Sequence, residues 1–379
     1  MLAQAFRRTG FAALAALTLA PAALQARIFF VTRPVDKNDG VCDRRCSLRE
    51  AIVAANQNPG PDMVFIPPGV YRLALPGPDE DLGATGDLDI TGDLTLYGAG
   101  PTVAILDGAG LDRVLDVHTP AAVEILHLTI RDGKGSGGGI RNTGRLTLFN
   151  SIVTGNSAPD FGFGGGIYSD NPGSALTLDH STVAGNRADG GGGGITAGFE
   201  LTVKDSTISG NHSATDFGGG VYLFTEARAS FNNVTITANS AARRGGGLYA
   251  ESADDPTSPS LANSIVAGNS APQDPDCLGV KVSSGYNLIG EGEGCPGFNA
   301  AAGDQTGTAA SPLDPRLGPL AGSIGVTPTH ALLAGSPAIN AGSPLPLGSD
   351  GGCGFIDQRA VARLNSRCDI GSFERRGRR

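Results

Sequence analysis

Between Gly137 and Ala271 the chain repeats one pattern of apolar and polar positions five times. Each copy opens with three glycines and an aliphatic residue, and successive copies start 26 to 28 residues apart. The triplets begin at Gly137, Gly164, Gly192, Gly218 and Gly245. The two apolar columns that follow are Leu148, Leu178, Val203, Phe231 and Leu261, and then Val153, Val183, Ile208, Ile236 and Val266. Self-similarity with a period of about 20 to 50 residues indicates a solenoid or a propeller.

The residue types within each copy predict short β-strands. Leu146-Thr147-Leu148 and Leu176-Thr177-Leu178 alternate apolar and polar side chains, as a strand with one buried face does. The repeat lacks the apolar spacing of a helix, and a propeller blade needs about 40 residues or more. A copy of about 27 residues fits three short strands joined by turns. The sequence therefore predicts an all-β fold, a parallel β-helix in which equivalent residues of successive coils are stacked.

One polar residue is the same in every copy. Three residues after the second apolar column the chain has Asn156, Asn186, Asn211, Asn239 and Asn269. Coils stack at about 4.8 Å, so we expect each side-chain amide to bond to those above and below it. A looser polar column predicts a second turn, at Asn150, His180, Asp205, Asn233 and Asn263.

A short helix is predicted before the repeats. Ser47-Leu48-Arg49-Glu50 is a capping box, in which each side chain accepts a hydrogen bond from the backbone N–H of the other residue. The helix continues to Asn56, and its apolar side would cover the first coil, whose open strand edge otherwise invites aggregation. Between residues 62 and 136 the coils are less regular, with short strands expected at 64–66, 88–90 and 94–96.

Residues 1–26 have the features of a signal peptide. Arg7 and Arg8 precede an apolar run, and small residues end the segment at Ala26. An uncleaved membrane anchor is the alternative, but the run is short and is interrupted by Pro21. We therefore expect a secreted or cell-surface protein without a transmembrane segment in its mature chain.

Export makes the six cysteines informative, because disulfides persist in oxidising compartments. Six cysteines permit 15 pairings. They occur as three sequential pairs, and local pairing is the simplest expectation. The expected bonds are Cys42–Cys46, Cys277–Cys295 and Cys353–Cys368. A zinc site is the alternative, but the chain has no C-x-x-C spacing at these positions.

Composition and net charge restrict the classes of function that the chain can have. The chain has 58 glycines, no tryptophan and a net charge of -9, which suits a fold of tight turns and aliphatic stacks. It offers no basic stripe for phosphates, so we expect no nucleic-acid partner. We expect a monomer without a required cofactor, with Ca²⁺ left open.

The two ends of the chain resemble known exported proteins. Cys46-Ser47-Leu48-Arg49-Glu50-Ala51 resembles the motif that names the CSLREA domain. The far end resembles the choice-of-anchor Q region, with Gly335-Ser336-Pro337-Ala338-Ile339, Asp357-Gln358-Arg359 and Cys368-Asp369-Ile370-Gly371. The resemblance implies an exported bacterial protein with a right-handed parallel β-helix of the pectin-lyase-like class. Asn340 and Ala360 depart from that pattern, which has Asp and Gly there.

These observations divide the chain into four parts. We predict a signal peptide at 1–26 and an N-terminal cap at 27–61, with a disulfide loop and the helix. The β-helix follows at 62–310, with its regular repeats at 137–271. Residues 311–379 are rich in loops and proline and are expected to wrap the last coil as a C-terminal cap.

Two surface features are candidate glycan sites. The loops after the ladder asparagines carry charges that stacking would gather into one strip. These are Asp160, Asp189, Asp216, Arg243, Arg244 and Asp274. The strip is either a solvated loop edge or a site for Ca²⁺ or a glycan. Tyr168, Tyr222 and Tyr249 directly follow the aliphatic residue that comes after a glycine triplet, and they are expected to point outward, where they would stack on sugar rings or cover the strand.

Two functions fit these features. The first is a non-catalytic β-helix that binds glycans or mediates cell-surface interaction. The second is a polysaccharide lyase or glycoside hydrolase acting in a groove along the solenoid. A tight carboxylate cluster with a base on adjacent coils would distinguish them. The sequence alone identifies no catalytic residue, and the fold does not settle the function.

Overall fold

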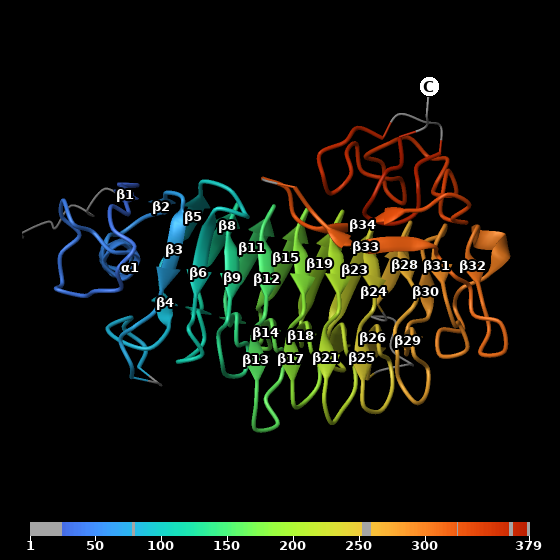
Figure 1. Cartoon of the computed structure of the whole chain (residues 1–379), viewed down its shortest axis with the longest axis horizontal. Coiled ribbons are helices and arrows are strands. Elements are labelled where there is room, and N and C mark those ends of the chain that lie inside the picture. The colour runs from blue at the N-terminus through green and yellow to red at the C-terminus, as the bar shows by residue number, and fades with distance from the viewer. Residues whose placement is uncertain (1–24, 78–79, 252–258, 324, 364–366, 377–379) are drawn as a thin grey trace, which may run out of the picture.

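The computed structural model describes residues 25–77, 80–251, 259–323, 325–363 and 367–376. Parallel strands from successive coils form a right-handed parallel β-helix, and each regular coil contributes one strand to each of three long sheets (Figure 1). The predicted fold is confirmed. It arises because short strands with one buried face cannot bury that face alone and must stack on their neighbours.

Sheet 1 has ten strands, which are β1 (Ile28–Phe30), β2 (Asp62–Ile66), β5 (Leu94–Gly98), β8 (Ala122–Leu126), β11 (Arg145–Phe149), β15 (Ala175–Asp179), β19 (Glu200–Lys204), β23 (Arg228–Asn232), β27 (Ser260–Ala262) and β30 (Val282–Ser283). Sheet 2 has eight, which are β4 (Leu88–Ile90), β7 (Leu115–Val117), β10 (Ile140–Asn142), β14 (Ile167–Ser169), β18 (Ile195–Ala197), β22 (Val221–Leu223), β26 (Leu248–Ala250) and β29 (Cys277–Leu278).

Sheet 3 has ten strands, which are β3 (Gly69–Arg72), β6 (Ala104–Asp107), β9 (Thr129–Arg131), β12 (Ile152–Thr154), β16 (Thr182–Ala184), β20 (Thr207–Ser209), β24 (Thr235–Thr237), β28 (Ile265–Val266), β31 (Leu288–Ile289) and β32 (Gln305–Thr306). A narrow fourth sheet comprises β13 (Ser157–Ala158), β17 (Arg187–Ala188), β21 (His212–Ser213) and β25 (Ser240–Ala241). The antiparallel pair is β33 (Leu317–Ala321) and β34 (Thr329–Leu332), and a 3-10 turn spans η1 (Ala300–Ala302).

The asparagine ladder is confirmed. Side-chain Nδ2 to Oδ1 distances are 3.0 Å from Asn156 to Asn186 and 3.0 Å from Asn186 to Asn211. They are 2.9 Å from Asn211 to Asn239 and 2.9 Å from Asn239 to Asn269. The ladder ends at Asp276, whose Oδ1 accepts a hydrogen bond from Asn269 Nδ2 at 2.9 Å. The repeat did not predict this last member. Each amide is both donor and acceptor, so the column satisfies its own buried polar groups.

The second polar column also forms a turn, as predicted. Its five residues all have positive φ, between 43° and 55°. Asn and Asp tolerate this left-handed conformation better than most residues. His180 therefore occupies a position whose backbone favours asparagine.

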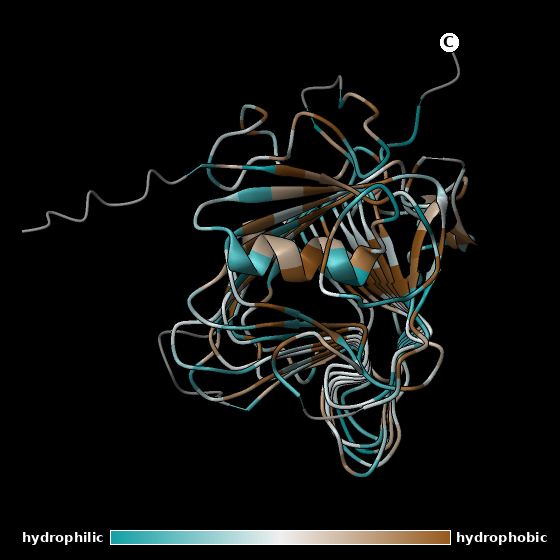
Figure 2. Ribbon diagram, turned by 90° about the vertical axis from the view of Figure 1, so that its left-hand side faces the viewer, coloured by the Kyte–Doolittle hydropathy of each residue, from teal (hydrophilic) through white to brown (hydrophobic). Residues whose placement is uncertain are grey.

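The N-terminal helix closes the first coil. Helix α1 (Leu48–Gln57) lies across the open end of the solenoid, in front of the apolar strands (Figure 2). The capping box is present, with Glu50 N donating to Ser47 Oγ at 3.1 Å and Ser47 N donating to Glu50 Oε2 at 2.7 Å. Leu48 and Ile52 are buried in the main core. The helix and its capping box form as expected, and β1 adds the first strand of sheet 1 beside β2.

The three local disulfides form as predicted, Cys42–Cys46, Cys277–Cys295 and Cys353–Cys368. The predicted signal peptide comprises residues 1–26, and residues 1–24 lie outside the described residues. Among the residues that the structure describes, none forms a helix long and apolar enough to cross a membrane.

The C-terminal segment differs from the prediction that it wraps the last coil. The described residues from 311 to 376 lie along the side of several coils (Figure 1). Thr182 Oγ1 donates to Pro328 O at 2.7 Å, and Thr207 Oγ1 donates to Gln358 Oε1 at 2.6 Å. Ile265 and Leu288 of sheet 3 also form an apolar cluster with Leu332, Ala338 and Ile370 of this segment, so the contact is both polar and apolar.

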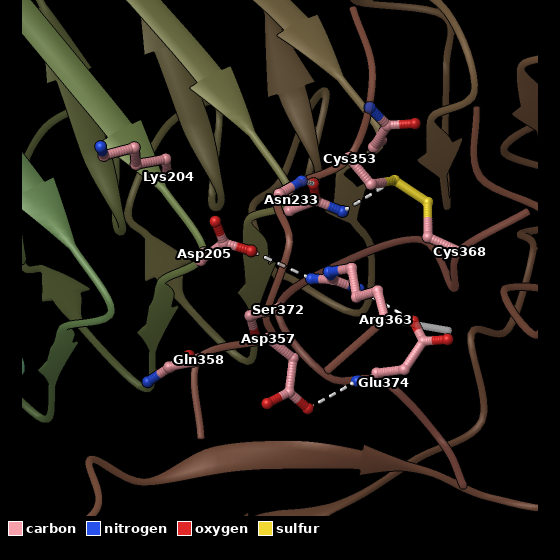
Figure 3. A network of polar contacts seen from close by, with 12 residues as sticks. Lys204, Asp205, Asn233, Cys353, Asp357, Gln358, Arg363, Cys368, Ser372 and Glu374 are labelled. Atoms are coloured by element: carbon pink, nitrogen blue, oxygen red, sulfur yellow. Dashed lines mark hydrogen bonds and ion pairs between the residues drawn. A yellow bond between two sulfur atoms is a disulfide. The ribbon is translucent and has the colours of Figure 1, made fainter. Parts of the chain in front are cut away.

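A buried arginine joins this segment to the solenoid (Figure 3). Arg363 Nη2 lies 3.1 Å from Asp205 Oδ1, and its Nη1 lies 3.1 Å from Glu374 Oε2. The side chain of Arg363 has no exposed surface, so these two carboxylates must compensate its buried positive charge. The resemblance to an anchor region thus corresponds to a tightly docked segment of the fold.

Candidate functional site

Sheet 2 places three charged residues side by side near the N-terminal end of the solenoid. Asp89 in β4 pairs in register with Asp116 in β7, and Asp116 pairs with Arg141 in β10. Each is the middle residue of its strand, between two residues that face the core. Because strand residues alternate between faces, all three belong to the outer face of sheet 2.

Asp87, Arg113 and His118 complete this cluster. Arg113 Nε lies 2.9 Å from Asp87 Oδ2, and its Nη2 lies 3.3 Å from Asp116 Oδ2. Arg141 Nη1 lies 3.1 Å from the same oxygen of Asp116. His118 Nε2 lies 2.7 Å from Asp89 Oδ1, so the imidazole is held by a carboxylate. The cluster therefore spans three adjacent coils.

Exposure separates three acids of the cluster from its basic residues, while the exposed Asp81 lies beside Asp89 and His118, with ligand atoms within 4.8 Å of one another. The side chains of Asp87, Asp89 and Asp116 are only 1 to 2% exposed. Those of Arg113, His118 and Arg141 are 16%, 23% and 40% exposed. We call these three side chains the basic face. It presents cationic and imidazole groups to solvent, backed by buried carboxylates, in a chain whose net charge is -9.

Burial and neighbouring charges change the acidity of two groups. Burial raises the pKa of Asp87 to about 7, against the opposing charge of the Arg113 guanidinium. The hydrogen bond to Asp89 raises the pKa of His118 above its ordinary value, and partial burial opposes this rise. Groups with displaced pKa values in one cluster are typical of sites that move protons. The solvent-exposed group of this pair is His118.

Arg49 of the N-terminal helix positions the loop beside the cluster. Its Nη1 donates to the carbonyl oxygens of Gly83, Thr85 and Asp87 at 3.2, 3.0 and 2.8 Å, and its Nη2 donates to Gly86 O at 2.8 Å. Gly83 N in turn donates to Asp89 Oδ2 at 2.8 Å. The loop therefore connects the N-terminal cap to the acid that holds His118.

Asp36 holds the same arginine from the other side. Asp36 Oδ1 lies 2.8 Å from Arg49 Nε, and Asp36 Oδ2 accepts from the backbone N–H of Ala74 at 2.8 Å and of Leu75 at 3.2 Å. The Asp36–Arg49 pair thus contacts the loop between β3 and β4 at its beginning and at its end. Both side chains are nearly fully buried.

The acidic members have the ligand type that hard divalent cations prefer. Asp87, Asp89 and Asp116 each offer a carboxylate oxygen within 4.8 Å of the other two. Asp116 Oδ1 is buried and has no hydrogen-bond partner among the described residues. Arg113 already contacts two of these carboxylates, so the chain supplies its own counter-charge here. The residues fit Ca²⁺ in ligand type.

The sequence contains a signal for this cluster that the glycine-triplet repeat does not reveal. Leu88-Asp89-Ile90 and Leu115-Asp116-Val117 are copies of one apolar–acidic–apolar pattern, 27 residues apart. These two copies show that the repeat continues N-terminal to Gly137, in coils that have no glycine triplet. Arg113 and His118 flank the second copy on the two sides of its strand.

The tyrosine column faces outward but is not an open platform. Tyr222 and Tyr249 pair in register, with ring centroids 5.2 Å apart. The expected exposure of Tyr222 is wrong, because only 5% of it is exposed. Phe163 lies 5.9 Å from its ring, and Glu251 Oε1 lies 2.5 Å from its hydroxyl. Tyr168 and Tyr249 are half-buried, and glycan binding by this column stays a prediction.

The predicted charged strip comprises Asp160, Asp189, Asp216, Arg243, Arg244 and Asp274. Stacking brings several of its members together. Asp160 N donates to Asp189 Oδ2 at 3.2 Å, and Arg244 Nε lies 3.4 Å from Asp274 Oδ2. The guanidinium of Arg243 lies 5.5 Å from the Phe217 ring centroid. The charges partly neutralise one another, and a role in binding Ca²⁺ or a glycan stays a prediction.

A comparison with protein families supports the fold. A family model described as right handed beta helix region matches residues 113–236, a range that includes the whole basic face. No curated protein matches the chain. Among solved structures, the crystal structure of pectate lyase Pel9A aligns with 93% of this chain and 98% of its own, at 15% identity and a TM-score of 0.38. That similarity is too low to carry an argument about the site.

Proposed function

We propose that this protein is an exported enzyme that cleaves acidic polysaccharides by β-elimination, with the basic face of sheet 2 as its active centre. The observation that carries the proposal is the basic face itself, which places an imidazole and two guanidinium groups at the surface over three buried carboxylates. A carboxylate cluster with a base on adjacent coils is the feature that separates an enzyme from a binding protein of this fold. The three disulfides support export.

The two arginines account for an acidic substrate. Arg guanidinium groups bind carboxylates by charge-assisted hydrogen bonds, often with two parallel contacts. Arg141 is the most exposed member, and Arg113 lies beside the same Asp116 oxygen. A uronate carboxylate held by them would lose much of its negative charge, which favours removal of the proton on the adjacent carbon.

His118 is the group placed to take that proton. Because its Nε2 is engaged by Asp89, the other ring nitrogen, Nδ1, is the basic atom. When Nδ1 accepts the proton, the C–H electrons form a carbon–carbon double bond and the glycosidic C–O bond breaks. The leaving oxygen then takes a proton from protonated His118 or from solvent. No water is added, and one product carries an unsaturated end.

Burial of the acids favours elimination over hydrolysis. Hydrolysis by two carboxyl groups requires both to reach the scissile bond from opposite sides. Asp87, Asp89 and Asp116 are 1 to 2% exposed, so these carboxylates lie behind the basic groups. In this arrangement they set the charge and orientation of the basic face and do not contact the substrate.

Binding without cleavage is the second candidate, and one observation favours it. Arg113 and Arg141 already pair with Asp116, so the basic face is preformed and could hold an anionic glycan with little rearrangement. This candidate retains the same residues and the same class of ligand. It differs only in that His118 would transfer no proton.

A polysaccharide panel distinguishes these candidates. The protein is incubated with polygalacturonate, alginate and hyaluronate, and with a neutral galactan, each with Ca²⁺ and with a chelator. Ultraviolet absorbance of unsaturated uronate and a reducing-end assay are recorded together with retention of the protein on each polymer. The proposal expects unsaturated ends from at least one acidic polymer and none from the galactan. Retention without new ends would support binding only, and reducing ends without unsaturation would indicate hydrolysis.

A further inference from the structure

A hollow lies on another side of the solenoid from the basic face, under the C-terminal segment. Its volume is about 200 Å³, and it opens at the turn between sheets 1 and 3. From the solenoid it is lined by His127, Phe149, Asn150 and His180, and from the C-terminal segment by Gln358 and Arg359. The basic face belongs to sheet 2, so the two sites are separate. The hollow has the size of a single small ring.

Three aromatic rings form one wall of this hollow. The Phe149 ring lies between His127 and His180, with centroid distances of 5.7 and 5.6 Å. The ring planes are inclined by 82° and 47°, so the three rings are not stacked face to face on one another. Inclined rings leave part of their faces available to a ligand. The apolar C–H face of a sugar is suited to such a wall.

Polar groups on the same wall have hydrogen-bonding capacity that the protein does not fully use. Asn150 Nδ2 lies 2.8 Å from His127 Nδ1, so Nδ1 is the acceptor and Nε2 carries the hydrogen of the neutral ring. Asp179 Oδ1 lies 2.5 Å from His180 Nδ1. His180 Nε2 is buried and has no hydrogen-bond partner among the residues that the structure places. A hydroxyl group of a ligand could bond to His127 Nε2 or to His180 Nε2.

The charges around the hollow are paired, which indicates the charge of the ligand. Asp179 is held by His180 and by Lys204, whose Nζ lies 2.9 Å from Asp179 Oδ2. Arg359 is paired with the carboxylate of Asp357, and both Nε and Nη2 contact Asp357 Oδ2. A hollow whose described wall charges are paired in this way does not favour an ion. It favours a neutral molecule with hydroxyl groups and an apolar face.

We propose that this hollow binds one neutral sugar ring of a glycan, independently of the basic face. The ring would pack on Phe149, and its hydroxyl groups would bond to His127, His180 and the amide oxygen of Asn150, whose Nδ2 already donates to His127 Nδ1 and to Gly325 O. A site of this kind would hold the protein on a carbohydrate surface without cutting it. Its occupancy does not depend on the elimination chemistry proposed for sheet 2.

The chain offers two matched variants that test this site. Phe149→Leu introduces the residue that the neighbouring coil has in register, Leu126, so the strand should tolerate it. His180→Asn introduces the residue found at equivalent turn positions of other coils, where φ is also positive. The control is Phe30→Leu, which removes an exposed ring at the far end of the same sheet.

The measurement is saturation-transfer NMR with the methyl glycosides of glucose, galactose, mannose and N-acetylglucosamine, followed by titration of any that bind. We expect at least one glycoside to bind and to shift the imidazole resonances of His127 and His180. Phe149→Leu should weaken it about five- to tenfold, the scale of one aromatic contact. His180→Asn should weaken it as well, while Phe30→Leu and Asp116→Asn should not.

Two results would overturn this proposal. One is the absence of saturation transfer to all four methyl glycosides in the parent protein. The other is binding that survives unchanged in both Phe149→Leu and His180→Asn. Because Asp116 belongs to the cluster on sheet 2 and does not line the hollow, loss of cleavage in Asp116→Asn with glycoside binding retained would separate this site from the proposed enzyme activity.

Discussion

The guanidinium group of Arg49 donates a 2.8 Å hydrogen bond to the backbone carbonyl oxygen of Asp87. Arg49 of the N-terminal helix thus contacts the loop that carries Asp87, one acid of the cluster. A cap that only covered apolar strand ends would not need a buried arginine, because burying a charge is costly unless it is fully paired. We infer that the cap both closes the solenoid and shapes the site.

Arg49→Lys tests this relationship. Lysine keeps the positive charge but cannot bond to Asp36 and to four carbonyl oxygens at once. Carbonyls left without a donor cost about 1–3 kcal/mol each when buried, so the urea midpoint should fall. Hydrogen exchange of residues 83–89 should increase more than that of the regular coils. Arg44→Lys, at an exposed position, is the control, and equal behaviour of the two variants would contradict the inferred role.

Stability should depend on pH through Asp87. Burial raises its folded-state pKa from 3.8 to about 7, so the folded state binds the proton more tightly than the unfolded state. That contribution is complete below the unfolded pKa and is lost as the pH rises through about 7. The raised pKa of His118 acts in the same direction above its ordinary value of 6.5.

The urea midpoint of the parent should therefore fall between about pH 5 and about pH 8. Asp87→Asn cannot ionise, and its midpoint should fall less over the same interval. Asp160→Asn, which removes an exposed carboxylate, is the control. A parent protein that becomes more stable over this interval, with no difference in Asp87→Asn, would show that Asp87 is ionised well below neutral pH.

Asp89 should control the acidity of His118. Its hydrogen bond to His118 Nε2 is the main cause of the raised imidazole pKa, so Asp89→Asn should lower that pKa. The pKa is read from the imidazole NMR signals during a pH titration. His212, whose pKa is lowered by burial on a distant coil, should titrate the same in both proteins. An unchanged His118 titration would mean that Asp89 does not hold the imidazole in solution.

The fold could be read from the sequence because the regular coils repeat the same residue types at the same positions. The asparagine ladder is the clearest case, since a side-chain amide can bond to an identical amide one coil away in both directions. Asn211 Nδ2 bonds to Asn239 Oδ1, and Asn211 Oδ1 accepts from Asn186 Nδ2. A column of one residue type therefore predicts both the stacking of the coils and their register.

The site could not be read in the same way. Arg49 meets the Asp87 loop across 34 to 38 residues, and no repeat relates them. The acids lie on early coils without glycine triplets, so aligning the regular repeats does not reach them. The exposure of Tyr222 was wrongly predicted because a strand pattern shows which face a residue occupies, not which loop side chains cover it. Here Phe163 and Phe224 do so.

Asn211→Ala should destabilise the solenoid from its middle coil. The change removes four hydrogen bonds to Val183, Asn186 and Asn239 and leaves buried polar groups without partners. The expected loss is about 1–3 kcal/mol in the free energy of unfolding, measured by urea denaturation. Thr202→Ala, on the exposed face of the same coil, should change little. An equal midpoint in both variants would show that the ladder contributes no stability.

The most direct test of the central claim compares initial cleavage rates of the parent, His118→Gln and Arg145→Gln on the acidic polymer that gives unsaturated ends. Glutamine at 118 keeps a side chain that can bond to Asp89 but cannot take a proton at neutral pH, while Arg145 is an exposed arginine on another sheet. Loss of a general base predicts a rate lower by about 100-fold or more in His118→Gln, with Arg145→Gln close to the parent. Equal rates in the parent and His118→Gln, or a parent that releases no unsaturated ends from any acidic polymer, would contradict the account.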